Sequence, residues 1–354
     1  MHEYLPNVFS FRGKANISAP YREADSKIVL LVPIHKPDLQ FCRCLRTHLI
    51  NGFEPILVNL GIDLGGDKAN KYFKIQGVFN YIKRNPDKLR PHDIITVVDG
   101  FDIYSQQGPE TLLERFKESG QKIYTGVDKN CFPNDPSGPV CNDTPESEYS
   151  PDAFGPETDK DQLWGDRHHT RPRWVNSGTI VGYYDALEEL YESMVNYKAL
   201  DDDHGSDQRV FAVHYYWGNF SMALDFKSRL AVSVVFSEWE LDFLKNSSTI
   251  KELGVKPWIG KIPNTGQAVT IDRHPIVRNR LMGTAPVFVH FPGIARGLMT
   301  GWGQSLWWTS GHDNATRILA DYVLDKVVTA AEDERTYTFR EVSLIIFRLV
   351  LWRY

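Results

Sequence analysis

Cysteine is scarce in this sequence. Only 4 of the 354 residues are cysteine, too few for a fold that depends on a disulfide framework. Cys42 and Cys44 are too close in the chain to pair easily. Cys131 and Cys141 flank a loop rich in proline, asparagine and aspartate and could form one bridge in an oxidising compartment. Neither pair has the spacing of a zinc site with a second pair of ligands.

An excess of positive charge is also missing. Lysine and arginine together number 40, against 45 aspartates and glutamates, so the net charge is −5, and no basic stripe is present. These features exclude a protein that binds nucleic acid. Hydrophobic residues at 42% and charged residues at 24% are ordinary for globular proteins, so we expect neither disorder nor a fibre. The sequence contains no internal repeat and no low-complexity tract.

Long apolar runs are missing too. No run reaches membrane-spanning length, so we expect no membrane span in this chain, and residues 1–20 lack the pattern of a signal peptide. The most hydrophobic stretch, residues 342–352, is short and is interrupted by Arg348, which indicates a docked helix. Oligomeric state is not indicated.

Asn-x-Ser/Thr sequons are well represented. They favour the lumen of the secretory pathway (ER or Golgi), while the missing signal peptide leaves the cytoplasm open. The five sequons begin at Asn16, Asn142, Asn219, Asn246 and Asn314.

Strands and helices alternate over the first two thirds of the chain. Apolar, β-branched runs predict strands at 27–33, 54–60, 94–98 and 122–127, and periodicity with caps predicts helices at 38–51, 71–84 and between Gly108 and Gly120. This alternation predicts an α/β fold with an open, mostly parallel central sheet and helices on both faces. We assign residues 1–310 to one domain with a long irregular loop at 128–172. Residues 311–354 are then a C-terminal helical extension packed on it.

The third predicted strand ends in two acids. Ile94 to Val98 form a buried run, and Asp99 and Asp102 follow it directly. Ligands of open α/β sheets bind beyond the carboxyl ends of the strands, and an unpaired buried charge is costly. Two carboxylates that face this crevice can share a divalent cation. The alternative is that Asp99 caps the next turn while Asp102 is solvated.

Several motifs, taken in order, resemble a known family. They are Lys74-Ile75-Gln76, Val98-Asp99-Gly100-Phe101-Asp102, Gly108-Pro109-Glu110, Asn176-Ser177-Gly178, the acidic stretch before Asp207-Gln208, Asp225-Phe226-Lys227-Ser228-Arg229 and Val287-Phe288-Val289-His290. From about residue 27 to residue 302 the chain resembles the glycosyltransferase domain of the procollagen lysyl hydroxylases (the PLOD family). More distantly, it resembles the collagen galactosyltransferases. The resemblance implies a GT-A fold, a UDP-sugar donor and Mn²⁺ or Mg²⁺ as cofactor.

The resemblance also implies a metal site. Its ligands would be Asp99, Asp102 and His290, and two carboxylates with one imidazole suit Mn²⁺ better than a closed zinc site. The alternative for His290 is a core histidine that ends a strand. Residues near the nucleotide, diphosphate and sugar of the donor would be Val32, Pro33, Ile34, Lys74, Asp99, Asn176 and Gly293.

Catalytic roles would lie in an acidic cluster. They fall on Asp202, Asp203 and Asp207, which precede or begin a predicted helix. The alternative is a solvated loop that caps this helix, with Ser206 as N-cap.

These parts predict a metal-dependent glycosyltransferase. It would move a sugar, glucose or galactose, from UDP to a hydroxyl of a glycan, small-molecule or protein acceptor, while a metal and a lysine neutralise the leaving diphosphate. The sequence departs from the family after His290, where Phe291-Pro292-Gly293 replaces Gly-Asn-Gly, and in a longer loop on the acceptor side. The alternatives are a catalytically silent nucleotide-sugar-binding relative and a metal-dependent hydrolase or nucleotidyltransferase that uses the same acids.

Overall fold

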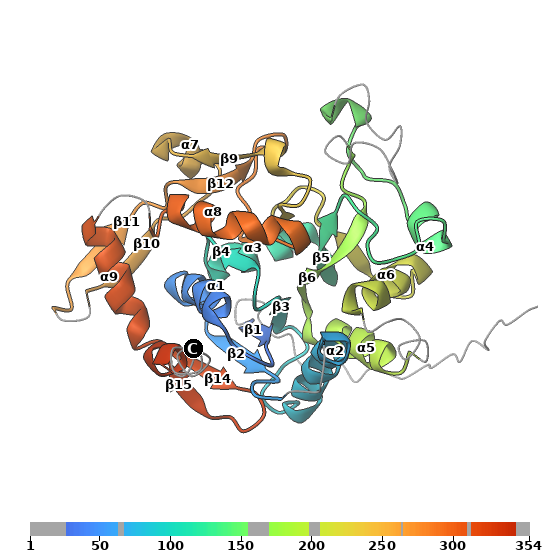
Figure 1. Cartoon of the computed structure of the whole chain (residues 1–354), viewed down its shortest axis with the longest axis horizontal. Coiled ribbons are helices and arrows are strands. Elements are labelled where there is room, and N and C mark those ends of the chain that lie inside the picture. Colours follow the sequence, from blue (N-terminus) through green and yellow to red (C-terminus); the bar gives the residue numbers. More distant parts are fainter. Residues whose placement is uncertain are drawn as a thin grey trace, which may run out of the picture.

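The structure is a computed structural model of the whole chain (Figure 1). It describes residues 26–62, 67–154, 170–197, 206–262, 265–309 and 313–344. Within these ranges, no helix is long and apolar enough to cross a membrane.

An eight-stranded sheet forms the centre of the fold, in the order β15-β14-β2-β1-β3-β6-β5-β7. Strands β6 and β15 run opposite to the other six. The sheet is therefore open and mostly parallel, and the predicted α/β fold is confirmed. The strands are β1 (Ile28–Pro33), β2 (Pro55–Val58), β3 (Ile94–Val98), β5 (Ile123–Asp128), β6 (Trp174–Tyr183), β7 (Met222–Leu224), β14 (Val327–Ala330) and β15 (Thr336–Thr338).

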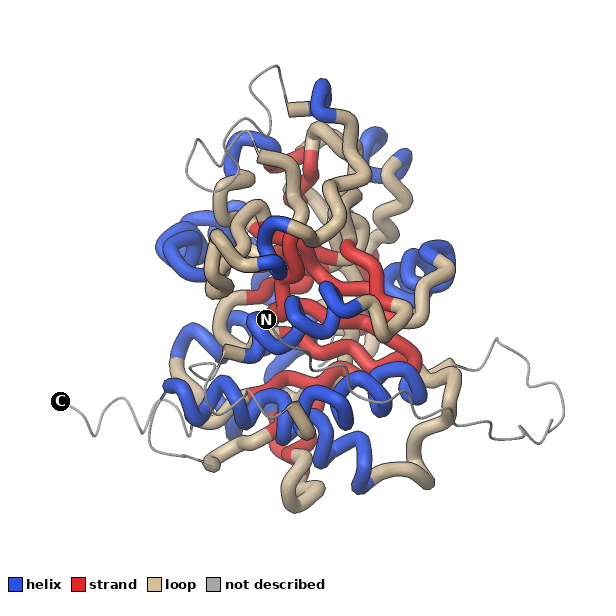
Figure 2. The backbone as a smooth tube through the Cα atoms, turned by 90° about the vertical axis from the view of Figure 1, so that its right-hand side faces the viewer, coloured by secondary structure: helices blue, strands red, loops and turns tan. Residues whose placement is uncertain are grey.

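Helices cover both faces of this sheet, as Figure 2 shows. Alternate residues of β1 point to opposite faces, so Leu30 and Val32 pack in one core and Val29 and Leu31 in the other. The first core includes α1 (Leu39–Ile50), α3 (Pro109–Ser119) and α9 (Asp313–Leu324). The second core includes α2 (Asp67–Arg84), α5 (Tyr184–Val195) and α6 (Asp207–Trp217). Each strand thus needs apolar residues on both sides, which explains the continuous apolar runs in the sequence.

A smaller sheet lies beside the central one and contains β4 (Ile103–Ser105), β13 (Phe288–His290) and β8 (Ala231–Ser233), with β13 in the middle. Strand β13 is antiparallel to β4, with His290 opposite Ile103. This register brings a histidine from the far end of the chain next to Asp102.

The remaining elements are short. There are two small antiparallel pairs. One joins β9 (Leu241–Leu244) to β12 (Ile276–Asn279), and the other joins β10 (Trp258–Lys261) to β11 (Ala268–Ile271). The short helices are α4 (Pro139–Asn142), η2 (Pro151–Ala153), η5 (Glu238–Glu240), α7 (Ser247–Glu252), η6 (Gly293–Leu298) and α8 (Met299–Ser305).

The long loop at 128–172 contains few regular elements where it is described. It contains α4 and η2, and residues 155–169 lie outside the described residues. Cys131 and Cys141 form a disulfide, which packs against Trp174. Cys42 and Cys44 are free and buried.

The C-terminal extension differs from the prediction of a helical segment. It begins with α9, but β14 and β15 then extend the central sheet beyond β2. Val327, Val328 and Thr329 are β-branched and favour a strand, and the open edge of β2 offers unpaired backbone groups. A helical turn resumes at Phe339, and residues 345–354 lie outside the described residues. The division of the chain at residue 310 remains a prediction.

Candidate functional site

The two strand-end acids and His290 converge at the carboxyl end of β3. Asp99 and Asp102 follow β3, and His290 ends β13. One ligand atom from each residue lies within 4.8 Å of the others. The Nε2 atom of His290 is 3.5 Å from Asp102 Oδ1 and 3.9 Å from Asp99 Oδ2. Three side chains that the sequence separates widely thus form one cluster.

This cluster has the ligand atoms of a metal site, and two of these atoms have no hydrogen-bond partner in the part of the chain that the structure describes. Asp102 Oδ1 and His290 Nδ1 are buried, and neither has a hydrogen-bond partner among the described residues. A buried carboxylate oxygen without a donor is costly unless a cation or proton satisfies it. Two carboxylates and an imidazole with an open side suit Mn²⁺ or Mg²⁺. The residues therefore fit a hard divalent cation.

The charges in the cluster are already coupled. Burial alone raises the pKa of Asp102, but His290 and Arg296 outweigh it and hold this pKa below its ordinary value. Burial alone lowers the pKa of His290, but Asp102 and then Asp99 outweigh it, so this pKa lies above its ordinary value. Nearby cationic groups therefore favour the charged form of Asp102, and the two carboxylates favour the charged form of His290.

Lys74 joins the cluster to helix α6. Its Nζ atom donates to Asp99 Oδ1 at 2.6 Å, Asp207 Oδ2 at 2.7 Å and the carbonyl oxygen of Ser177 at 3.0 Å. Burial works against the charge of Lys74, but Asp207 and Asp99 outweigh it and raise its pKa well above the ordinary value. Lys74 is therefore a fixed, buried cation held between two carboxylates.

The Asn176-Ser177-Gly178 segment of β6 supports this arrangement from behind. Asn176 donates to Asp128 Oδ2 at 2.8 Å, and its own Oδ1 accepts from the backbone of Gly178 at 2.9 Å. A Cβ on Gly178 would lie 2.2 Å from the His290 ring. Only glycine at this position lets the imidazole pack directly against the strand.

A cavity of about 450 Å³ opens in front of these residues. We call it the strand-end pocket. It lies at the carboxyl ends of β1 and β3, where ligands of open α/β sheets bind. It is lined by Pro33, Ile34, His35, Asn59, Ile62, Phe73, Lys74, Asp99, Gly100, Phe101, Asp102, Phe132, Asp207, Gly293 and Arg296.

Comparison with known proteins identifies relatives of the chain. No protein-family model matches it. It is 26% identical over 209 residues to a procollagen-lysine,2-oxoglutarate 5-dioxygenase of Drosophila melanogaster, which covers 58% of this chain and 25% of that protein. It is 24% identical over 193 residues to the human multifunctional procollagen lysine hydroxylase and glycosyltransferase LH3, which covers 53% of this chain and 23% of that protein.

The chain is similar to one part of the procollagen lysine hydroxylases. The resemblance read from its motifs is thus confirmed, although the chain spans only about a quarter of the length of these relatives. Among solved structures, a glycosyltransferase involved in the glycosylation of the major capsid of PBCV-1 matches 78% of this chain and 98% of its own, with 12% identity and a TM-score of 0.41.

Most residues proposed for the donor site line the strand-end pocket. Val32 and Asn176 do not. Val32 lies in the core, and both polar groups of the Asn176 side chain are used within the protein. Contact between these two residues and a donor stays a prediction. Asp202 and Asp203 lie outside the described residues.

Arg296 is a site residue that the sequence reading missed. It lies on η6, and its Nη2 and Nε atoms donate to Asp102 Oδ2 at 2.6 and 2.9 Å. Burial lowers the pKa of Arg296, but Asp102 outweighs this and raises it. The signal for Arg296 was its place three residues after Gly293, in the turn that follows the proposed metal histidine. His35, Asn59, Phe101 and Phe132 also line the pocket and were not proposed.

Proposed function

We propose that the chain is a metal-dependent glycosyltransferase that moves glucose or galactose from a UDP-sugar to a hydroxyl acceptor. The observation that carries this proposal is the cluster of Asp99, Asp102 and His290, whose two acids line one pocket together with the cationic side chains of Lys74 and Arg296. Similarity to procollagen lysine hydroxylases, one of which is named a glycosyltransferase, supports it. The acceptor would be a glycan, a small molecule or a protein.

Asp99, Asp102 and His290 would hold Mn²⁺ (or Mg²⁺). When bound, the metal would neutralise charge on the leaving diphosphate. Arg296 lies beside Asp102 and is more than half exposed at its side chain (58%), so it can reach a phosphate oxygen without losing its place on η6. Lys74 adds a fixed positive charge from the opposite side. Pro33, Ile34 and Gly293 would contact the donor because they line the same cavity.

The charges of the pocket indicate an order of binding. Asp99, Asp102 and Asp207 outnumber the paired cations Lys74 and Arg296, so the side chains alone present no net positive charge to an anionic donor. A bound divalent cation changes this balance and attracts the diphosphate. We therefore expect the metal to strengthen donor binding greatly, and the donor to strengthen metal binding by the same factor.

Asp202, Asp203 and Asp207 are proposed to act on the transferred sugar or on the acceptor. Of these, Asp207 lies in the described residues, as the first residue of α6. Its Oδ2 accepts from Lys74 and from Ser177 Oγ at 2.9 Å. This oxygen is therefore occupied, and a direct role for Asp207 would fall to Oδ1.

The test is a screen of UDP-sugars for protection against thermal unfolding, with Mn²⁺ or with EDTA. A ligand that binds only the folded state raises the melting temperature by mass action. We expect protection by UDP-glucose or UDP-galactose that requires Mn²⁺. Asp102→Asn should weaken binding of Mn²⁺ in the presence of UDP by roughly 100-fold or more, since even loss of an outer-shell partner costs up to that much.

The control is Asp242→Asn, which removes an acid paired with Arg278 away from the pocket. It should leave Mn²⁺ binding unchanged. Equal metal affinity in Asp102→Asn and the unmodified protein would refute the metal site. Turnover of UDP-sugars that no acceptor accelerates would indicate a hydrolase, and protection without turnover would indicate a silent binding protein.

We also propose the lumen of the secretory pathway as the compartment. The disulfide between Cys131 and Cys141 supports this, because such bonds persist in oxidising compartments. The sequon asparagines Asn142, Asn219 and Asn246 are exposed. Asn246 caps α7 through its Oδ1 atom, which remains an acceptor when a glycan occupies the amide nitrogen. Expression through the secretory pathway with and without a glycosidase would reveal the glycans as a change in mass.

A further inference from the structure

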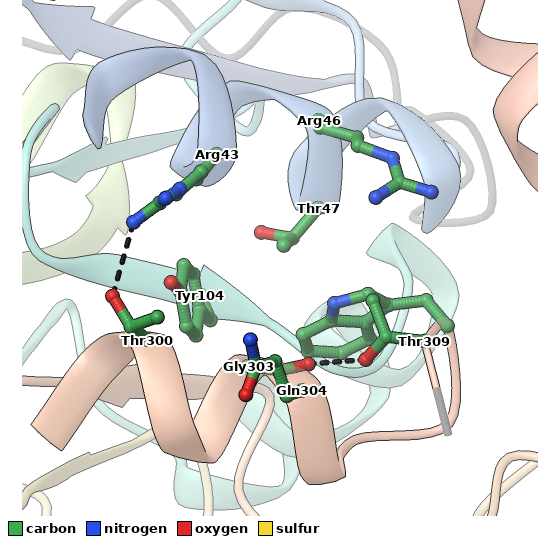
Figure 3. Close-up of a pocket in the computed structure, with 9 residues that line it drawn as sticks. Arg43, Arg46, Thr47, Tyr104, Thr300, Gly303, Gln304 and Thr309 are labelled. Atoms are coloured by element: carbon green, nitrogen blue, oxygen red, sulfur yellow. Dashed lines mark hydrogen bonds between the residues drawn. The ribbon is translucent and has the colours of Figure 1, made fainter. Parts of the chain in front are cut away.

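A second cavity lies between helices α1 and α8, with β4 beneath it (Figure 3). We call it the α1–α8 pocket. Its volume is about 160 Å³, enough for a small molecule, and it shares no lining residue with the strand-end pocket. It is lined by Arg43, Arg46, Thr47, Tyr104, Thr300, Gly303, Gln304, Trp308 and Thr309.

Two arginines line this cavity, and no acidic residue does. In Figure 3 both extend from α1, at the two ends of the pocket. Arg43 donates to Thr300 Oγ1 at 3.0 Å and to Gln40 Oε1 at 3.4 Å. Arg46 is partly buried, and no described residue forms a hydrogen bond or an ion pair with it. Burial lowers the pKa of Arg46, and no neighbouring carboxylate opposes that effect. Burying a charged group without a counter-charge is energetically costly, so an anion that pairs with Arg46 would be stabilised here.

The other polar groups of the pocket leave few donors free. Thr47 Oγ1 donates to the carbonyl oxygen of Cys44 at 2.7 Å, and the Tyr104 hydroxyl donates to that of Met299 at 3.3 Å. Gln304, in contrast, is exposed and has no hydrogen bond to a described residue. The Arg46 guanidinium and the Gln304 amide are therefore donors without a partner among the described residues, next to a wall made by the buried rings of Tyr104 and Trp308.

We propose that the α1–α8 pocket binds the oxyanion group of a small ligand, a carboxylate, phosphate or sulfate, with Arg46 as its main partner and Gln304 as a second donor. A guanidinium presents a planar fork that matches two oxygens of such a group. The aromatic wall excludes water from one side of the ion and so strengthens the contact. This site does not depend on the proposed transferase activity, because it shares no residue with the strand-end pocket.

The test uses the full chain, labelled with ¹⁵N and free of divalent metal and UDP. Inorganic phosphate, glucose 6-phosphate and glucuronate are titrated at constant ionic strength, and the arginine Nε–Hε resonances are followed. The Arg46 resonance is the one that is absent from the spectrum of Arg46→Gln, and we expect it to shift saturably in the unmodified chain. The affinity of Arg46→Gln for the same compound should be roughly tenfold weaker or more. Comparison of inorganic phosphate with the two sugars distinguishes a free ion from an oxyanion carried on a sugar ring.

Two arginine controls locate the binding. Arg84→Gln removes an exposed arginine of α2, and Arg296→Gln removes the arginine of the strand-end pocket. Both should keep the affinity of the unmodified chain. The proposal is overturned if none of the three compounds shifts the Arg46 resonance, if folded Arg46→Gln binds as tightly as before, or if Arg296→Gln abolishes binding. Should Arg46→Gln not fold, Arg46→Lys and the resonance of the unmodified chain still decide the question.

Discussion

The strand-end pocket and the α1–α8 pocket both contain cationic side chains, but they treat the charge in opposite ways. In the strand-end pocket, Lys74 and Arg296 each lie against carboxylates at 2.6–2.7 Å. In the α1–α8 pocket, Arg46 has no counter-charge among the described residues. We therefore expect the first site to attract an anion only when a cation is added. We expect the second to attract an anion directly. Arginine and lysine content alone would not separate these two kinds of site.

We expect the largest effect when the paired cation of the strand-end pocket is removed. Lys74→Met leaves Asp99 and Asp207 buried without their shared cation, and loss of one partner of a buried pair typically costs about 3–5 kcal/mol of stability. We expect a loss of this size in urea unfolding, together with weaker UDP-sugar binding. Lys83→Met, which removes a surface lysine paired with Glu188 and Glu192, should change stability little.

A double variant isolates the cause. Adding Asp207→Asn to Lys74→Met removes one of the two stranded charges and should recover part of the lost stability. If Lys74→Met unfolds at the same urea concentration as the unmodified chain, the lysine does not carry the buried charge balance.

The second prediction concerns a buried base with no charged partner. His48 is fully buried, and its Nδ1 lies 2.5 Å from Ser105 Oγ. Burial lowers the pKa of His48 to about 3, against about 6.5 in the unfolded chain. The unfolded chain thus binds a proton that the folded chain rejects. The stability contribution is complete above the unfolded pKa and falls as the pH drops toward 3, by about 3 kcal/mol at pH ~4.5.

The measurement is the free energy of unfolding of the unmodified chain and of His48→Asn between pH 7 and about 4.5. The variant keeps a polar group near Ser105 but cannot titrate, so its slope should be smaller. His92→Asn, at an exposed position, should reproduce the unmodified profile. Identical slopes for His48→Asn and the unmodified chain would mean that other groups cause the pH dependence.

We expect the smallest effect on stability when Arg46, the unpaired cation of the α1–α8 pocket, is removed. Because Arg46 is partly buried and has no counter-charge to lose, Arg46→Gln should lower the free energy of unfolding by no more than about 0.5 kcal/mol. A loss comparable with that of Lys74→Met would reveal a partner of Arg46 and would remove the contrast between the two pockets. Urea unfolding of both variants under one set of conditions makes the comparison.

Local sequence patterns predicted Asp99 and Asp102 but not the cationic groups beside them. Asp99 and Asp102 were predictable because strand periodicity locates the end of β3, and strand ends of open sheets face the ligand. His290 and Lys74 came from the resemblance, since no local pattern distinguishes a ligand histidine from a core histidine. Arg296 was missed because its role depends on the turn of η6 toward Asp102, a tertiary contact across 194 residues.

The same limit applies to the fold. The alternating strands and helices were predictable from long, strongly periodic runs. Strands β14 and β15 were not, because runs as short as Val327–Ala330 and Thr336–Thr338 carry little periodicity and gain their stability from the edge of β2. The Asn176-Ser177-Gly178 motif alone does not explain why Gly178 is a glycine. The structure does, because a Cβ at this position would lie 2.2 Å from the His290 ring.

The pairing of β13 with β4 also determines when the proposed metal site can form during synthesis of the chain. A ribosome makes the two aspartates early and the histidine only after some 190 further residues, and domains tend to fold from the N-terminus as they emerge. A nascent chain or fragment that ends before residue 288 would carry the whole Asp-x-x-Asp motif yet lack β13, the strand that places His290 opposite Ile103. Insertion of that strand would close the small sheet and complete the proposed metal site in a single event. The chain would therefore gain its metal affinity late in its synthesis, after most of the central sheet has been made.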